Sequence, residues 1–118
     1  HYPLRRQRQM CIRDRVSLIE RRMLEVAMAL ASNPRIVLLD EVAAGLNPTE
    51  ISHIIETIEK IRSDLGISVF WIEHVMSAVM KTSDRIIVLS AGEKIAEGKP
   101  SEVAKSSVVI EAYLGPTG

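Results

Sequence analysis

The sequence predicts an α/β protein in which a mostly parallel sheet is flanked by helices. Three apolar stretches, residues 36–39, 67–72 and 85–89, have the length and the branched side chains of strands. The first is apolar throughout and the second is rich in β-branched and aromatic residues, which is typical of strands buried on both faces of a parallel sheet. Helical segments separate the three stretches, and this alternation favours right-handed crossovers between parallel strands.

The first helix is predicted to begin at Ser17, which has the spacing of a capping box with Glu20, and to stop before Asn33-Pro34. A stripe at helical spacing is expected to face the core, with Met23, Val26 and Leu30 widening it. The stripe consists of Leu24, Ala27, Met28 and Ala31. The methionines at helical spacing are interpreted as core filler; they are Met23, Met28, Met76 and Met80.

The second helix has unusually complete start signals. Asn47 suits the N-cap, Pro48 the first helical position, and Glu50 completes a capping box. Gly66 suits the left-handed turn after the helix. One face of this helix is apolar and consists of Ile51, Ile54, Ile55, Ile58 and Ile61. Further along, short helices are expected at 75–81, 100–105 and 108–114, and a short strand at 94–97.

The composition excludes several classes of protein. With 118 residues, 47% hydrophobic and 25% charged, the chain suits one small globular domain. A net charge of zero and 3% aromatic residues argue against a nucleic-acid partner. The single cysteine, Cys11, excludes an internal disulfide and a Cys-rich zinc site. Because neither a membrane-spanning run nor a secretory signal is visible, a cytosolic protein is the default expectation.

The N-terminal segment differs from the rest. Residues 1–22 carry seven arginines against two acidic residues, and residues 3–15 show no periodicity. A basic arm that binds phosphate or lipid is one interpretation. We favour a segment foreign to the domain, because residues 9–19 resemble translated sequencing-adapter DNA. The expected division is therefore a non-native or disordered basic segment at 1–19 and the domain at 20–118.

Polar pairs follow two of the predicted strands, at the edge where open α/β sheets bind ligands. Asp40 and Glu41 end the first strand, and Glu73 and His74 end the second. Adjacent strand residues point to opposite faces, so one acid can face a metal and the other a reacting water, as NTP hydrolysis requires. His74 could donate to a terminal phosphate.

Each of these residues also has a purely structural interpretation. Asp40 and Glu41 can simply mark the exit of a strand into solvent, and His74 can be a surface residue at a helix N-terminus. Glu73 is expected only to end its strand.

Three segments together resemble the C-terminal half of an ATP-binding cassette (ABC) ATPase, a P-loop NTPase fold, over residues 24–115. They are Ile-Val-Leu-Leu-Asp-Glu at 36–41, Ala-Gly-Leu-Asn-Pro at 44–48 and Ile-Glu-His at 72–74. The resemblance implies that Asp40 is the Walker B aspartate, which holds Mg²⁺ through water, and that Glu41 polarises the attacking water. It implies that His74 touches the γ-phosphate, and that Gly45 and Asn47 lie in the D-loop facing a second subunit.

Within that family, four stretches look most like the ATP-binding subunits of branched-chain amino-acid importers: 43–48, 72–76, 92–98 and 109–115. The implied ligands are ATP and Mg²⁺. The implied partners are a second ATPase subunit, identical or not, transmembrane permease subunits and, indirectly, a substrate-binding protein. The implied location is the cytoplasmic face of the cell membrane.

The sequence also departs from the family pattern. The P-loop Gly-x-x-x-x-Gly-Lys-Ser/Thr is absent from these 118 residues, as are the Q-loop and most of the helical subdomain. The Leu-Ser-Gly-Gly-Gln signature, which contacts nucleotide across the dimer, aligns on residues 16–20 and keeps only Ser17. Val42 replaces a common proline. We therefore expect this chain alone to be inactive toward ATP, to expose apolar surface and to self-associate.

Two alternatives stay open. A lipopolysaccharide-export ATPase has a similar C-terminal half. A non-catalytic α/β interaction module would keep the fold while Glu41 and His74 share no cleft.

Overall fold

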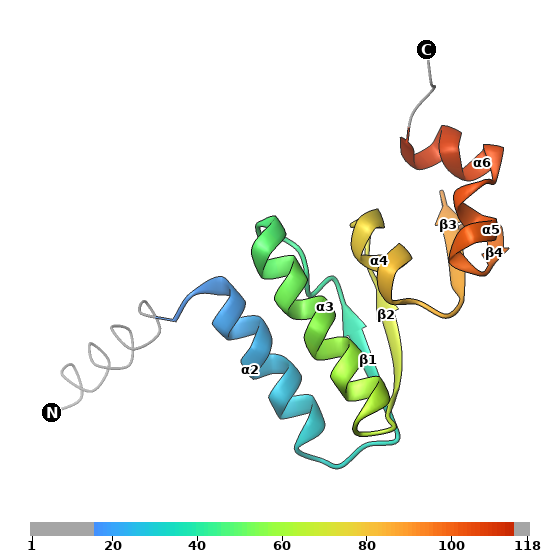
Figure 1. Ribbon diagram of the computed structural model, residues 1–118. Coiled ribbons are helices and arrows are strands. Elements are labelled where there is room, and N and C mark those ends of the chain that lie inside the picture. The colour runs from blue at the N-terminus through green and yellow to red at the C-terminus, as the bar shows by residue number, and fades with distance from the viewer. Residues whose placement is uncertain (1–15, 115–118) are drawn as a thin grey trace, which may run out of the picture. The chain divides into compact units, whose positions relative to one another are not determined.

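The computed structural model describes residues 16–114, and Figure 1 shows their helices and strands. These residues form two compact units, and the boundary between the units falls between Glu73 and His74. The first unit contains two helices and a parallel pair of strands. The second contains an antiparallel hairpin and short helices.

Helix α2 (Leu18–Leu30) begins where the sequence predicts, since the Ser17 hydroxyl accepts a hydrogen bond from the Glu20 N–H. The central stripe that is predicted to face the core is exposed, whereas the residues that are predicted to widen it pack in the core. Leu24 is 59% and Met28 69% exposed, whereas Val26 is buried. The side chains that pack beside Val26 are Ile19, Met23, Ala29 and Leu30. Both faces are apolar at helical spacing, so the pattern alone could not select between them.

Strands β1 (Ile36–Asp40) and β2 (Ser68–Ile72) pair in parallel, with Ile36 opposite Ser68 and Asp40 opposite Ile72. Helix α3 (Pro48–Ser63) connects them and has the predicted capping box. The Asn47 side chain accepts from the Glu50 N–H at 2.9 Å, and the Glu50 carboxylate accepts from the Asn47 N–H at 3.0 Å. Gly66 has the predicted left-handed conformation, with φ 65°.

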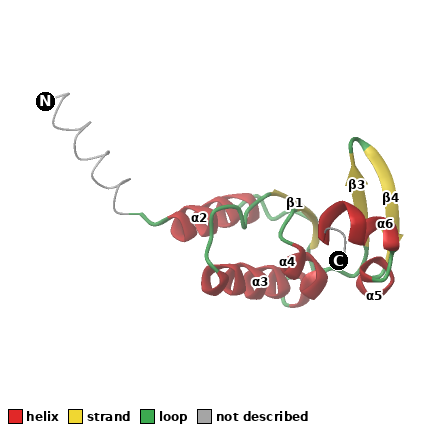
Figure 2. Cartoon of the chain, turned by 90° about the horizontal axis from the view of Figure 1, so that it is seen from above, coloured by secondary structure: helices red, strands yellow, loops and turns green. Residues whose placement is uncertain are grey.

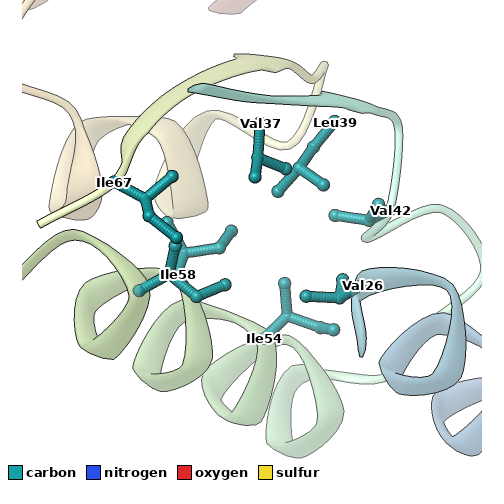
Figure 3. Close-up of a cluster of buried hydrophobic side chains, with 8 residues drawn as sticks. Val26, Val37, Leu39, Val42, Ile54, Ile58 and Ile67 are labelled. Atoms are coloured by element: carbon teal, nitrogen blue, oxygen red, sulfur yellow. The ribbon is translucent and has the colours of Figure 1, made fainter. Parts of the chain in front are cut away.

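The core of the first unit lies between one face of the β1–β2 pair and the two helices (Figure 3). Val37 and Leu39 alternate along β1 and meet the buried isoleucines of α3 and Val26 of α2. The predicted apolar face of α3 is confirmed by the burial of Ile54, Ile58 and Ile61.

The opposite face of the β1–β2 pair is exposed, contrary to the expectation of strands buried on both faces. Leu38 is 71% and Phe70 53% exposed, and Ile36 and Ile72 are similarly open. We call these four side chains the open sheet face. Along β1 the residues of the open sheet face alternate with the buried ones. The apolar run of β1 therefore supplies both faces of the strand, and the described residues cover only one of them.

The second unit begins with α4 (Met76–Thr82) and continues into strands β3 (Ile86–Ser90) and β4 (Glu93–Gly98). The α/β class is confirmed. Within residues 16–114, β3 pairs antiparallel with β4. The connection of two residues, Ala91-Gly92, explains this, because so short a link joins only antiparallel strands.

Three short helical stretches follow the hairpin: α5 (Pro100–Ala104), α6 (Ser107–Val109) and a π-helical stretch, Ile110–Leu114. Figure 2 shows α5 and α6 beside the β3–β4 hairpin. Val103 and Val109 from these helices pack with Ile86 and Val88 of β3. No helix within the described range is long and apolar enough to span a membrane.

Glu97 forms ion pairs at the surface of the β3–β4 hairpin. The Glu97 carboxylate accepts hydrogen bonds from Lys94, at 2.9 Å, and from Arg85. These two partners hold the pKa of Glu97 below its ordinary value of 4.5.

Candidate functional site

Asp40 is the last residue of β1 and lies opposite Ile72 of β2. It is exposed, and the alternation along β1 places it on the same face as Leu38. A carboxylate at the carboxyl end of a parallel strand is where ligands of open α/β sheets bind. The structure therefore places Asp40 as the strand-end argument predicts.

Glu41 leaves the strand in an unusual backbone conformation. Its φ is 52°, in the left-handed region that residues with a side chain rarely adopt. Its N–H donates to the carbonyl of Ile72 at 2.8 Å, one step beyond the last paired residues. The rule of alternating faces therefore ends at Asp40, and the placement of the two carboxylates on opposite faces stays a prediction.

The chain after Glu41 forms a compact turn packed into the first unit. Val42 is buried and Ala43 is only 1% exposed. The Ala44 N–H donates to the Glu41 carbonyl at 3.2 Å, and the Leu46 N–H donates to the Ala43 carbonyl at 3.3 Å. We call residues 41–44 the Glu41 turn.

Glu73 does more than end its strand, which corrects the sequence interpretation. Its Oε2 accepts a hydrogen bond from the Ala43 N–H at 3.1 Å, in a partly buried position. A buried backbone N–H needs such an acceptor, because an unpaired one is costly. The signal that could have found this contact is topological: the ends of neighbouring parallel strands lie side by side, so a carboxylate after β2 can reach the turn after β1.

Gly45 and Asn47 lie between the Glu41 turn and α3. Gly45 has φ 79°, and a Cβ atom there would lie 3.0 Å from Leu18 Cδ2, so this position favours glycine. The Asn47 side chain caps α3. The structure thus gives both residues a local role, and their contact with a second subunit stays a prediction.

Ser17 and His74 are the two remaining predicted site residues. The Ser17 hydroxyl caps α2 through Glu20, at 3.3 Å, so helix capping accounts for this serine locally. His74 is exposed and is the first residue of the second unit, two positions before α4. A crevice shared by His74 and the two carboxylates stays a prediction, as does nucleotide contact by Ser17.

The residues at the end of β1 fit a magnesium ion held with the help of phosphate. Mg²⁺ typically takes one or two carboxylates, several waters and substrate phosphate oxygens. Asp40 supplies one exposed carboxylate at the strand end. Over the described range 16–114 there is no cluster of three or more His, Cys, Asp or Glu side chains for a metal held by protein alone.

Comparisons with known proteins agree with this arrangement. A family model described as "Branched-chain amino acid ATP-binding cassette transporter" matches residues 93–115. The high-affinity branched-chain amino acid transport ATP-binding protein BraF of Pseudomonas aeruginosa is 44% identical over 96 residues, which is 81% of this chain. LivG of Escherichia coli K12, with the same description, is 42% identical over the same length. The chain spans 38% of the length of each of these relatives.

Two further comparisons widen the set. The lipopolysaccharide export system ATP-binding protein LptB of Escherichia coli K12 is 38% identical over 81% of this chain and 39% of its own length. Among solved structures, the ADP conformation of MJ1267, an ATP-binding cassette of an ABC transporter, matches with a TM-score of 0.76 and 28% identity. That match covers 86% of this chain and 41% of MJ1267. The chain therefore belongs to the ATP-binding cassette family, and it corresponds to part of that family's ATP-binding domain.

Proposed function

We propose that the chain is part of the ATP-hydrolysing subunit of a branched-chain amino-acid importer. The observation that carries the proposal is the end of β1, where exposed Asp40 is followed by Glu41 in a fixed, left-handed turn. The higher identity to BraF and LivG than to LptB supports the importer over the exporter.

All but one of the predicted residues have a defined role in this function. Asp40 would hold Mg²⁺ through water, and the bound ion would supply positive charge to the phosphates. Glu41 orients the attacking water and accepts its proton. His74 donates a hydrogen bond to the terminal phosphate. Gly45 and Asn47 face a second ATPase subunit. Ser17 keeps one position of the signature but lies in the segment that we expect to be foreign to the domain, so we assign it no role.

The proposed setting is the cytoplasmic face of the membrane. There, two ATPase subunits would bind paired permease subunits, and a substrate-binding protein would deliver the amino acid to the permease. The names of the relatives support amino-acid transport, and the exposed Gly45 and Asn47 offer a surface for a second subunit.

The 118 residues alone should not turn over ATP. They contain no Gly-x-x-x-x-Gly-Lys-Ser/Thr segment, so the β- and γ-phosphates have no cradle of backbone amides and no lysine. We expect no ATPase activity above background for the purified chain. Turnover that Glu41→Gln abolishes would contradict this part of the proposal.

A chimera tests the function itself. Residues 20–118 replace the matching stretch of BraF, and the chimera is expressed with the transporter's other subunits in cells that lack BraF. We expect restored leucine uptake and ATP hydrolysis, and a loss of at least about 100-fold in turnover for Glu41→Gln, as for removal of a catalytic base. The matched control is Glu56→Gln on the exposed side of α3, which should retain activity.

The same chimera separates the alternatives. A lipopolysaccharide exporter predicts that residues 20–118 function in LptB and fail in BraF. A non-catalytic module predicts that neither chimera hydrolyses ATP and that Glu41→Gln changes nothing. Either result would contradict the importer proposal.

A further inference from the structure

The backbone of Glu41 needs an explanation, because a glutamate at φ 52° is held in a conformation that costs energy. Such a residue keeps its conformation only where its surroundings fix the chain on both sides. On the N-terminal side, the Glu41 N–H is bound to the Ile72 carbonyl at 2.8 Å. That bond extends the β1–β2 ladder by one step and fixes the entry to the turn.

The C-terminal side of the turn is fixed through Ala43. Ala43 is 1% exposed, so its N–H has almost no access to water. The acceptor for this N–H is Oε2 of Glu73, at 3.1 Å, and Glu73 comes directly after Ile72. Two consecutive residues therefore hold both ends of the Glu41 turn by hydrogen bonds. Ile72 accepts through its backbone carbonyl, and Glu73 accepts through its carboxylate.

We propose that Glu73 is a positioning residue, whose carboxylate holds the Glu41 turn and so fixes the conformation of Glu41. Its relevance to ATP hydrolysis rests on the proposed function, whereas its hold on the turn does not. A carboxylate suits this task because a hydrogen bond to a charged acceptor is about twice as strong as a neutral one. The side-chain oxygen of glutamine can accept the same bond more weakly, and alanine cannot accept it at all.

The test uses the isotope-labelled 118-residue chain, studied by NMR without nucleotide. Two signals are followed: hydrogen exchange of the Ala43 amide, and the strong NOE between the Glu41 amide and its own Hα that a positive φ produces. For Glu73→Ala we expect roughly tenfold or faster exchange at Ala43, the change for losing a bond to a charged acceptor. We also expect a weaker Glu41 NOE.

Two further variants separate positioning from general stability. Glu73→Gln should keep the Glu41 NOE and raise Ala43 exchange less than Glu73→Ala does. Glu56→Ala, at an exposed glutamate of α3, should change neither signal. Should Glu73→Ala not fold, Glu73→Gln carries the test, with exchange at Ala43 faster by about threefold or more for the weaker acceptor and unchanged at Ile54 and Ile58.

The outcomes that overturn the proposal are distinct from failure of the ATPase proposal. Unchanged exchange at Ala43 would overturn it, as would an equal rise at Ala43, Ile54 and Ile58, which indicates global destabilisation. No nucleotide, permease or chimera enters the measurement. An inactive BraF chimera with an intact response at Ala43 would therefore reject the function and leave the positioning role standing.

Discussion

The two strand pairs of this chain are built in opposite ways. β3 and β4 are neighbours in sequence, joined by the Ala91-Gly92 turn and covered by helices that follow directly. β1 and β2 are separated by the whole of α3, and their pairing depends on the isoleucine face of that helix. The hairpin therefore forms from local contacts, whereas the parallel pair needs a crossover and a core assembled from distant segments.

The difference also concerns what each pair leaves exposed. The β1–β2 pair leaves its open sheet face in solvent, and the candidate site lies at the end of the same two strands. The hairpin carries the ionic cluster around Glu97 on its outside. The candidate catalytic residues therefore lie at the β1–β2 pair, whose assembly depends on distant segments. This contrast predicts how each strand pair responds to substitution.

The largest effect is expected in the core of the parallel pair. Ile54→Ala removes a fully buried side chain and should lower the free energy of unfolding by about 2–5 kcal/mol. Chemical denaturation followed by circular dichroism measures the loss. Ile87→Ala, at a half-exposed position of β3, is the control and should cost clearly less. Equal losses would contradict the expectation that the buried core of the parallel pair responds more strongly than the exposed face of the hairpin.

The second effect concerns association through the open sheet face. Leu38→Lys replaces one of the four exposed apolar side chains with a charge, which should weaken self-association by roughly tenfold or more when that leucine is buried in the contact. Sedimentation velocity over a concentration series measures this. Leu65→Lys, at an exposed leucine outside the sheet, is the matched control. A monomeric wild-type chain at all concentrations would contradict the expectation.

A smaller effect is expected at the start of α3. Asn47→Ala removes the side chain that accepts from the Glu50 N–H, and the loss of such a cap costs about 1 kcal/mol. Thermal unfolding measures the change. Asn47→Asp keeps a capping oxygen and should lie close to the wild type. The capping interpretation fails if the aspartate and alanine variants are equally destabilised.

The smallest effect is expected at the hairpin and depends on pH. Lys94 and Arg85 lower the pKa of Glu97 below 4.5 in the folded chain. Their contribution to stability is therefore present at pH values above 4.5. It is lost as the pH falls through the lowered pKa. Glu97→Gln should therefore lower the melting temperature slightly at neutral pH, with the difference shrinking in acid. Glu93→Gln is the control, and an unchanged difference at low pH would contradict the assignment.

Local signals in the sequence predicted local structure well. The capping box of Asn47 and Glu50 and the left-handed Gly66 are confirmed, because each depends on a few consecutive residues. Such local signals could not identify which face of α2 is buried. Leu24 and Met28 form as good an apolar stripe as Met23 and Val26, and packing against both β1 and α3 selects between them.

In the candidate site, too, some features could be predicted from local sequence and others could not. Asp40 could be located because a strand end is visible as the end of an apolar run. The left-handed backbone of Glu41 could not, since it is set by bonds to Ile72 and to the residues after it. The role of Glu73 at Ala43 joins positions 30 residues apart, and no periodic pattern reports such a contact.

The bond between Ala43 and Glu73 has a mechanical consequence. Glu73 is the last residue before the boundary between the two compact units, so the covalent chain connects its backbone to His74 while its side chain is tied to the Glu41 turn. A change in backbone torsion at Glu73 would therefore also disturb its hydrogen bond with the Ala43 N–H. The last residue of the first unit is thereby held to the Glu41 turn of the same unit by its side chain.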